Sequence, residues 1–231
     1  AYVSKTAVSR CYAEYRSESG VTINGFDSGG IINWDNSLIN YCLRINSFGS
    51  GSDYFVLKDF SNGNVCAPTA ATNVVWYWAT KRWCVPAIYP VYNLPNDKYT
   101  RGTAIFDIMN TAMGTGYYWG TWDSWVLEGY RSYFNCRESS GGTWNCALLS
   151  TSATFADYQA AISSNCPVHL MLRSSSNPFA EGHDVFCLGY ATGTNNYLVI
   201  MDGWNTNGRL VRFGYYSHMQ GYKIWVNSNF V

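Results

Sequence analysis

The sequence predicts an α+β fold in which a helical N-terminal lobe packs on an antiparallel β-sheet formed by the C-terminal part of the chain. Two observations indicate this order. Pro68 places the start of an apolar helix near Cys66, because proline is tolerated only in the first turn of a helix. From Pro167 onward, short apolar segments alternate with turns, a pattern typical of strands.

The helix that starts near Cys66 is expected to be buried. Ala70, Val74 and Trp78 share one face with Cys66, and further small or apolar residues line another face. A helix that is apolar over most of its circumference is usually buried. Three more helices are predicted, at about 101–113, 122–134 and 154–164, with Thr154 as a possible N-cap of the last.

The second half of the chain carries most of the predicted strands. Their ranges are 168–173, 184–190, 197–201, 209–213 and 222–226. Asn207-Gly208 is a strong signal for a two-residue hairpin, and residues 54–57 could form a further strand. Residues 1–52 read as an N-terminal segment of short strand-like pieces and turns, either a remnant of a pro-segment or an added subdomain. The main domain is expected to span residues 53–231.

Composition excludes several classes of protein. Hydrophobic residues make up 47% of the chain and aromatic residues 17%, which excludes disorder. Fifteen basic and fifteen acidic residues cancel without forming a basic cluster, so nothing indicates nucleic-acid binding. No apolar run is long enough for a membrane span, and no signal peptide is visible. Because charged residues are only 13%, we expect a secreted or cell-surface protein.

Eight cysteines could serve as ligands, nucleophiles or disulfide partners. No C-x-x-C pair occurs, so a structural zinc site is not indicated. Cys187 lies in an apolar strand pattern and is interpreted as a small buried side chain. If Cys66 stays reduced as well, six cysteines remain for up to three bridges, and Cys136 and Cys146 are the first pair to test.

Cys66 is the candidate nucleophile. A thiol must become a thiolate to attack, and a helix N-terminus supplies about half a positive charge that favours the thiolate. The alternative interpretation is a buried structural thiol. The helix start fixed by Pro68 favours the nucleophile, as do the small residues Ala67, Ala70 and Ala71, which let a substrate backbone approach.

Three histidines could act as the base. His169 lies in the middle of an apolar strand and is interpreted as structural, and His218 has no acidic neighbour in sequence. His183 follows Gly182 and opens an apolar strand, a position at the end of a sheet. His183 is therefore the predicted general base.

Asp202 is the predicted acid that orients His183. If the turn between the two strands centres on Thr192-Gly193, His183 lies opposite Asp202, with Cβ atoms about 4.5–5.5 Å apart. A turn at Asn195-Asn196 would break this pairing. The alternative interpretation of Asp202 is a solvated turn residue. Asp184 is nearer in sequence but points to the other face of the strand, because strand side chains alternate.

Acyl chemistry at Cys66 also requires donors for the oxyanion. The backbone N–H of Cys66 at the helix start is one candidate. Asn62 and Asn64 in the preceding turn are candidates for a side-chain donor, with Asn64 preferred. Both are also ordinary turn residues.

These residues resemble the papain-like cysteine peptidases, particularly the bacterial branches near the bacteriocin-processing (C39-like) and streptopain peptidases. Cys66 at the head of a buried helix and Gly182-His183 match the nucleophile and base. Asp202-Gly203-Trp204 is similar to the family's Asn-Ser-Trp, whose Trp shields the histidine. The resemblance covers roughly residues 55–231 and implies a helical lobe, a sheet lobe and a peptide-binding cleft. The family's usual Gln six positions before the cysteine is Phe60 here.

The expected function is hydrolysis of peptide bonds in a peptide or protein substrate through a thioester on Cys66, without a metal or cofactor. Two alternatives stay open. Acyltransferases and transglutaminase-like enzymes also use Cys, His and Asp in this order. A catalytically silent module that binds peptide or carbohydrate through its ten Trp and nineteen Tyr residues is the other.

Overall fold

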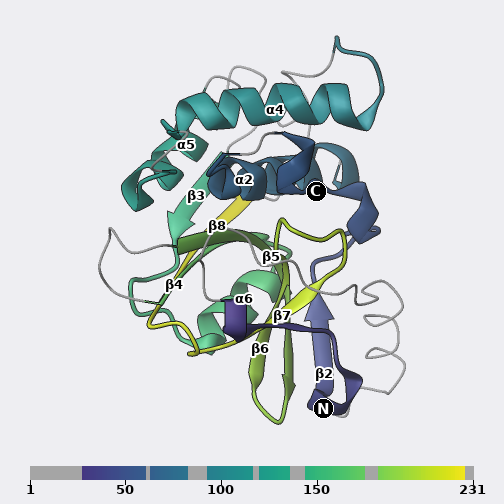
Figure 1. The fold of residues 1–231 in the computed structure, drawn as a ribbon, viewed down its shortest axis with the longest axis vertical. Helices are drawn as coiled ribbons and strands as arrows, with labels where there is room; N and C mark the ends of the chain where they lie inside the picture. The colour runs from purple at the N-terminus through teal and green to yellow at the C-terminus, as the bar shows by residue number, and fades with distance from the viewer. Residues whose placement is uncertain are drawn as a thin grey trace.

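The computed structural model describes residues 28–60, 63–82, 93–116, 120–135, 144–174 and 182–226. Within these ranges, eight strands form one antiparallel sheet, and a helical layer lies above it in Figure 1. The α+β class predicted from the sequence is confirmed. The strands are β1 (Ile31–Asn33), β2 (Ile39–Arg44), β3 (Trp144–Leu148), β4 (Val168–Arg173), β5 (Gly182–Gly193), β6 (Asn196–Met201), β7 (Arg209–Arg212) and β8 (His218–Val226).

Strand β5 is the centre of the sheet. The strand order is β1-β7-β6-β5-β4-β8-β3, and β2 pairs with β5 outside this path. Strand β4 pairs with residues 182–187 of β5, and β2 continues along the same side at residues 189–193. A β-bulge at Leu188 separates the two stretches. The bulge shifts the register between β5 and β6, so alternation cannot be counted straight through it.

The helices described are α2 (Cys66–Trp76), α4 (Lys98–Ala112), α5 (Asp123–Asn135) and α6 (Phe155–Ser163). All residues of α2 after Cys66 are buried, as the sequence predicted, and the helix continues into a π-helical turn over Tyr77–Lys81. The other three predicted helices are confirmed to within one turn at each end. At the start of α6, the backbone N–H and the hydroxyl of Thr154 both donate to Oδ2 of Asp157, at 2.7 and 2.8 Å.

The helices cover different faces of the sheet. His169 of β4 and Asp184 of β5 lie on one face, and Tyr130 of α5 and Cys66 of α2 contact them there. Helix α4 packs on α2 from the side away from the sheet (Figure 1). Helix α6 packs on the opposite face, where the ring of Phe155 contacts the ring of Tyr190 edge-on.

Two local predictions were wrong. Residues 54–57 are not a strand but link two 3-10 turns, because the Asn73 side chain of α2 binds both the N–H and the C=O of Phe55 in place of a neighbouring strand. Asn207-Gly208 does not form a tight hairpin. It lies in a longer connection from β6 to β7 that follows Met201, with Ile200 and Arg209 as the nearest paired residues.

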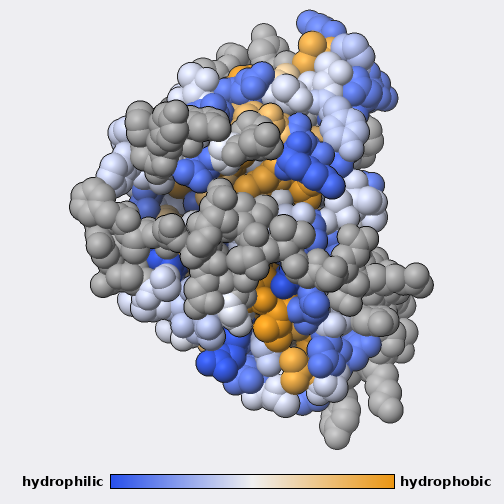
Figure 2. All heavy atoms as spheres, in the orientation of Figure 1, coloured by the Kyte–Doolittle hydropathy of each residue, from blue (hydrophilic) through white to orange (hydrophobic). Residues whose placement is uncertain are grey.

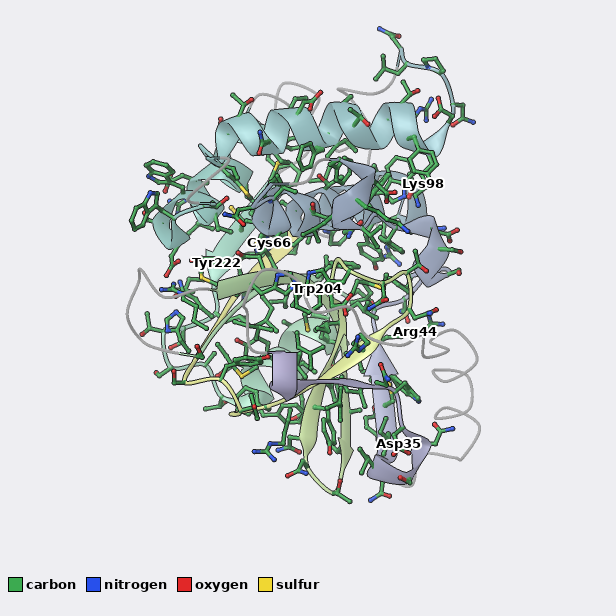
Figure 3. All side chains as sticks on the ribbon, viewed as in Figure 1. Asp35, Arg44, Cys66, Lys98, Trp204 and Tyr222 are labelled. Carbon is green, nitrogen blue, oxygen red and sulfur yellow. The ribbon has the colours of Figure 1, made fainter. Side chains whose placement is uncertain are left out.

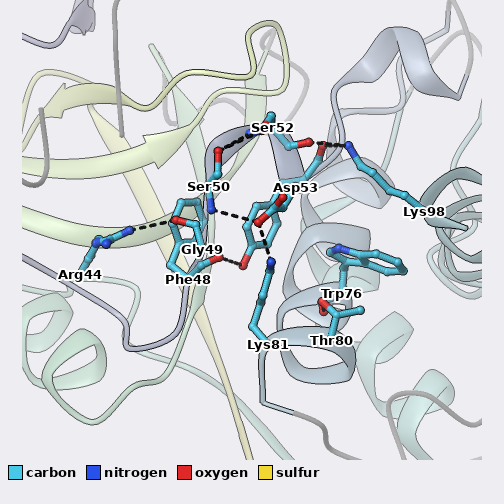
Figure 4. Close-up of polar contacts among 11 residues, drawn as sticks. Arg44, Phe48, Gly49, Ser50, Ser52, Asp53, Trp76, Thr80, Lys81 and Lys98 are labelled. Atoms are coloured by element: carbon cyan, nitrogen blue, oxygen red, sulfur yellow. Dashed lines mark hydrogen bonds and ion pairs between the residues drawn. The ribbon is translucent and has the colours of Figure 1, made fainter. Parts of the chain in front are cut away.

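The N-terminal segment is built into the sheet and the core through β1 and β2. Beyond β2, the turn over Gly51–Asp53 is held against the helical layer (Figure 4). Asp53 pairs with Lys81 after α2, and Lys98 of α4 donates to the carbonyl of Ser52 at 2.9 Å. The expected domain boundary after residue 52 falls inside this turn, and the boundary itself stays a prediction.

The visible surface is mixed in character. Figure 2 shows hydrophobic residues in patches among hydrophilic ones, over both the helical layer and the sheet. The exposed large hydrophobic side chains of the described ranges include Tyr99, Trp122, Trp125 and Tyr215. No helix in these ranges is long and apolar enough to cross a membrane.

The paired hydrogen bonds of Asn73 give a test of how α2 is anchored. We expect Asn73→Ala to lower the free energy of unfolding by about 2–4 kcal/mol, because two buried backbone groups of Phe55 lose their partners. Chemical denaturation measures the change. Thr103→Ala, at an exposed position of α4, is the matched control and should change stability by less than about 0.5 kcal/mol. Equal stability of the two variants would contradict this assignment.

Candidate active site

Cys66 is the first residue of α2 and is half-buried, with its sulfur directed at the sheet. The thiol donates a hydrogen bond to Oδ2 of Asp184 at 3.7 Å. Asp184 directly follows the predicted base, His183, so the predicted nucleophile contacts the strand that carries this base. Figure 3 shows Cys66 and Trp204 at the level where the helical layer meets the sheet.

The surroundings of Cys66 favour the neutral thiol. Burial raises the pKa of Cys66 to about 12, and the negative charge of Asp184 adds to this effect. The backbone N–H groups of Asp184 and Ala67 act in the opposite direction. The sequence had led us to expect a thiolate stabilised by the helix N-terminus. The effect of the helix N-terminus stays a prediction, and the charged group that the sulfur contacts is the carboxylate of Asp184.

His183 is the second residue of β5 and is buried. Its Nε2 lies 2.6 Å from the backbone oxygen of Asp202. A carbonyl only accepts hydrogen bonds, so Nε2 carries the hydrogen and Nδ1 carries the lone pair. Burial lowers the pKa of His183, an effect partly offset by this bond and by the charges of Asp202 and Asp184. The ring of Trp204 stacks on the imidazole at 4.2 Å with an interplanar angle of 10°.

Asp202 contacts His183 through its main chain rather than through its carboxylate. Its Oδ1 accepts the backbone N–H groups of Trp204 and Asn205, each at 2.9 Å. Its Oδ2 lies 3.3 Å from the guanidinium of Arg209. The carboxylate is therefore committed to closing the turn after β6, and the direct carboxylate–imidazole bond expected from the sequence is replaced by a bond to the backbone carbonyl.

The register from which that bond was inferred was wrong. Cys187 pairs with Ile200 and Thr192 with Asn196, so the turn centres on residues 194–195. Asp202 reaches His183 because the chain turns just after β6 ends at Met201. Arg209 of β7, which neutralises Asp202 and also binds the carbonyls of β1, had no signal in the local sequence.

His169 is structural in the sense that it is fully buried, but its partners were not foreseen. Its Nε2 lies 2.9 Å from Oδ1 of Asp184, and its Nδ1 lies 3.0 Å from the hydroxyl of Tyr130. The available signal was a buried His and a buried Asp on neighbouring strands. His218 bonds to Gln220 on its own strand.

Of the two side-chain oxyanion donors predicted from the sequence, only Asn64 lies within the described residues. Asn64 is exposed in the turn before α2, and Asn62 lies outside the described residues. Phe60, at the position of the family's usual Gln, stacks on Phe106 at 4.1 Å and has no polar group to offer. The role of Asn64 stays a prediction.

The described ranges hold four further cysteines. Cys187 is fully buried, as expected, Cys42 is buried in β2, and Cys146 and Cys166 are free thiols. Cys136, the expected partner of Cys146, lies outside the described residues.

A thiol at the start of a buried helix contacts the strand that carries a buried imidazole with a fixed tautomer, an arrangement that defines an α+β protein with a candidate thiol–imidazole site. Residues 52–230 match the Peptidase_C39 like family, so the chain belongs to this family. It is a cysteine-type peptidase, and the resemblance noted in the sequence is confirmed.

Two solved structures are similar to the chain. The wild-type interpain A cysteine protease of Prevotella intermedia shares 9% identity, with 83% of this chain and 98% of that chain covered and a TM-score of 0.48. The Pseudomonas avirulence protein AvrPphB shares 11% identity, with 77% and 99% covered and a TM-score of 0.34. A search of curated protein sequences found no match.

The stacked Trp204 gives a test of the environment of His183. We expect Trp204→Ala to raise the pKa of His183 toward its ordinary value of 6.5, because the change removes the ring that shields the imidazole. NMR titration of the imidazole measures the shift. Trp122→Ala, at an exposed site, should leave the titration unchanged. An unchanged or lower pKa of His183 in Trp204→Ala would refute the shielding role of Trp204.

Proposed function

We propose that this peptidase cleaves peptide or protein substrates through a thioester on Cys66, with His183 as general base and acid and Asp202 as the residue that orients it. The observation that carries the proposal is the short contact between Nε2 of His183 and the carbonyl of Asp202. It fixes the tautomer in which Nδ1 can accept a proton. The proximity of Cys66 to β5 at Asp184 supports the same assignment.

The reaction starts from a neutral thiol and a neutral imidazole. Nδ1 of His183 takes the Cys66 proton as the sulfur attacks the carbonyl carbon of the substrate, and the tetrahedral intermediate forms. The imidazolium then protonates the leaving amine, which leaves a thioester. Water, deprotonated by His183, attacks the thioester and releases the acid and the free thiol. No metal or cofactor takes part in these steps.

Oxyanion donors and the residue that positions His183 support these steps. The backbone N–H of Cys66 is among the first N–H groups of α2 and is a natural donor to the oxyanion, with Asn64 as the second candidate. Asp202 acts as a positioning residue. Its carboxylate closes the turn that aims its carbonyl at His183, and its negative charge favours the imidazolium.

Substitution of Cys66 tests the mechanism. We expect Cys66→Ala to lower turnover of casein by at least about 1000-fold without loss of the fold, because no other group forms the thioester. Cys146→Ala, which removes a thiol of β3, is the matched control and should keep its activity. Retained turnover in Cys66→Ala, with a native circular dichroism spectrum, would rule the mechanism out.

The fate of the thioester separates hydrolysis from acyl transfer. Water and amines compete for the same intermediate, so turnover of casein with a fluorescent amine present shows which one reacts. We expect new N-termini and little incorporated label. Incorporation without cleavage would assign the protein to the acyl-transfer alternative, and neither product would favour a silent binding module.

The pH dependence follows from the burial of His183. Only the neutral imidazole can take the thiol proton, and burial lowers its pKa below 6.5. Activity should therefore persist as the pH falls to 6.5 and decline only at lower pH. The acid limb of kcat/KM measures this, and Trp204→Ala should move it upward. An acid limb above pH 6.5 in the unmodified protein would argue against His183 as a buried neutral base.

A further inference from the structure

One short segment of the chain contacts both the helix that carries Cys66 and the turn that holds His183. It comprises residues 51–57 and runs from the 3-10 turn η3 (Gly51–Asp53) to the first residue of the 3-10 turn η4 (Leu57–Asp59). We call it the connecting segment. None of its side chains takes part in the steps described above, so its two contacts are a separate feature of the fold.

The first contact of the connecting segment is with α2. The Asn73 side chain accepts the backbone N–H of Phe55 at 2.8 Å and donates to the carbonyl of Phe55 at 2.9 Å. Asn73 and Phe55 are 1% and 0% exposed. Loss of either bond would leave a buried polar group unpaired, which is costly. The pair therefore fixes the position of the connecting segment on α2.

The second contact is with the turn after β6, which comprises residues 202–206. The backbone N–H of Leu57 donates to the carbonyl of Gly203 at 2.7 Å. Gly203 directly follows Asp202, whose own carbonyl accepts from Nε2 of His183 at 2.6 Å. The connecting segment thus holds the peptide group next to the one that binds the imidazole.

The connecting segment and this turn are packed without space between them. A Cβ on Gly51, which is buried, would overlap the backbone oxygen of Thr206. A Cβ on Gly203 would overlap the side chain of Leu57, and Gly203 has a φ of +77°, a conformation that favours glycine. The two backbones therefore approach each other as closely as glycine allows.

We propose that the backbone N–H of Leu57 is a positioning group for the reaction. Its bond to the carbonyl of Gly203 fixes the turn that orients His183 relative to the helix that carries Cys66. Residues 55–57 are consecutive, so a displacement at one contact is passed directly to the other. Misplacing a catalytic group by about 1 Å can lower the rate about 100-fold. The inference rests on the proposed function in taking Cys66 and His183 as the reacting groups.

Two substitutions at Leu57 separate the hydrogen bond from the side chain. Both remove the leucine side chain, but Leu57→Pro also removes the N–H, whereas Leu57→Ala keeps it. Proline fits this position because Leu57 begins a 3-10 turn and Val56 before it is extended, with φ −118° and ψ 164°. We expect kcat for casein to be at least about tenfold lower in Leu57→Pro than in Leu57→Ala. KM should differ by less than about threefold, because the change concerns the orientation of His183 and not substrate binding.

A second measurement at Leu57 requires no turnover. The hydrogen on Nε2 of His183 lies in a short bond to the carbonyl of Asp202, so its proton NMR resonance should lie far downfield. We expect Leu57→Pro to move this resonance upfield, and Leu57→Ala to leave it near its original position. A merely structural role would lower the stability of Leu57→Pro without moving the resonance. The same resonance and the same kcat in both variants would overturn the inference.

Gly51→Ala tests the same contact without a change at Leu57. The added methyl group must displace the backbone at Thr206, whereas Ser52→Ala, at an exposed position of the same 3-10 turn, adds nothing there. We expect Gly51→Ala to shift the His183 resonance and to lower kcat at least about threefold, and Ser52→Ala to change neither. A folded Gly51→Ala protein with both values unchanged would also overturn the inference. Shifted resonances in a protein that does not cleave casein would support the positioning of His183 and refute the proposed function alone.

Discussion

The seating of α2 on the sheet determines where every other group of the site lies. The helix is buried on all sides after its first residue, and Asn73 ties it to the backbone of Phe55. It therefore cannot slide without exposing apolar surface or breaking buried hydrogen bonds. Its N-terminal end meets the beginning of β5, so the thiol of Cys66 lies against a strand that begins with two titratable residues after Gly182, His183 and Asp184.

The first residues of β5 carry two chemically different groups, His183 and Asp184. The carbonyl of Asp202 holds His183 in the tautomer that can accept a proton. The negative charge of Asp184 disfavours loss of the proton from the Cys66 thiol. Burial acts on the thiol and the imidazole in the same sense, since it disfavours the charged form of each.

Much of the fold could be predicted because its signals are local. Pro68 marked the start of α2, Thr154 the start of α6, and the apolar run at 168–173 coincides with β4. The errors arose where distant residues decide. The bulge at Leu188 changes the β5–β6 register without any break in the hydrophobic pattern. The carboxylate of Asp202 is taken by Arg209, and the contact of Cys66 with Asp184 depends on which face of the sheet α2 covers.

The position of β2 has a consequence for how the chain can be processed. It lies beside β5 just beyond the end of β4, so residues 39–44 occupy one hydrogen-bonding edge of β5 at Gly189–Gly193. A proteolytic product that began after β2 would present the backbone of that glycine-flanked stretch as an open edge, and open edges recruit extended segments of other chains. Retention of these few residues thus guards the folded protein against self-association.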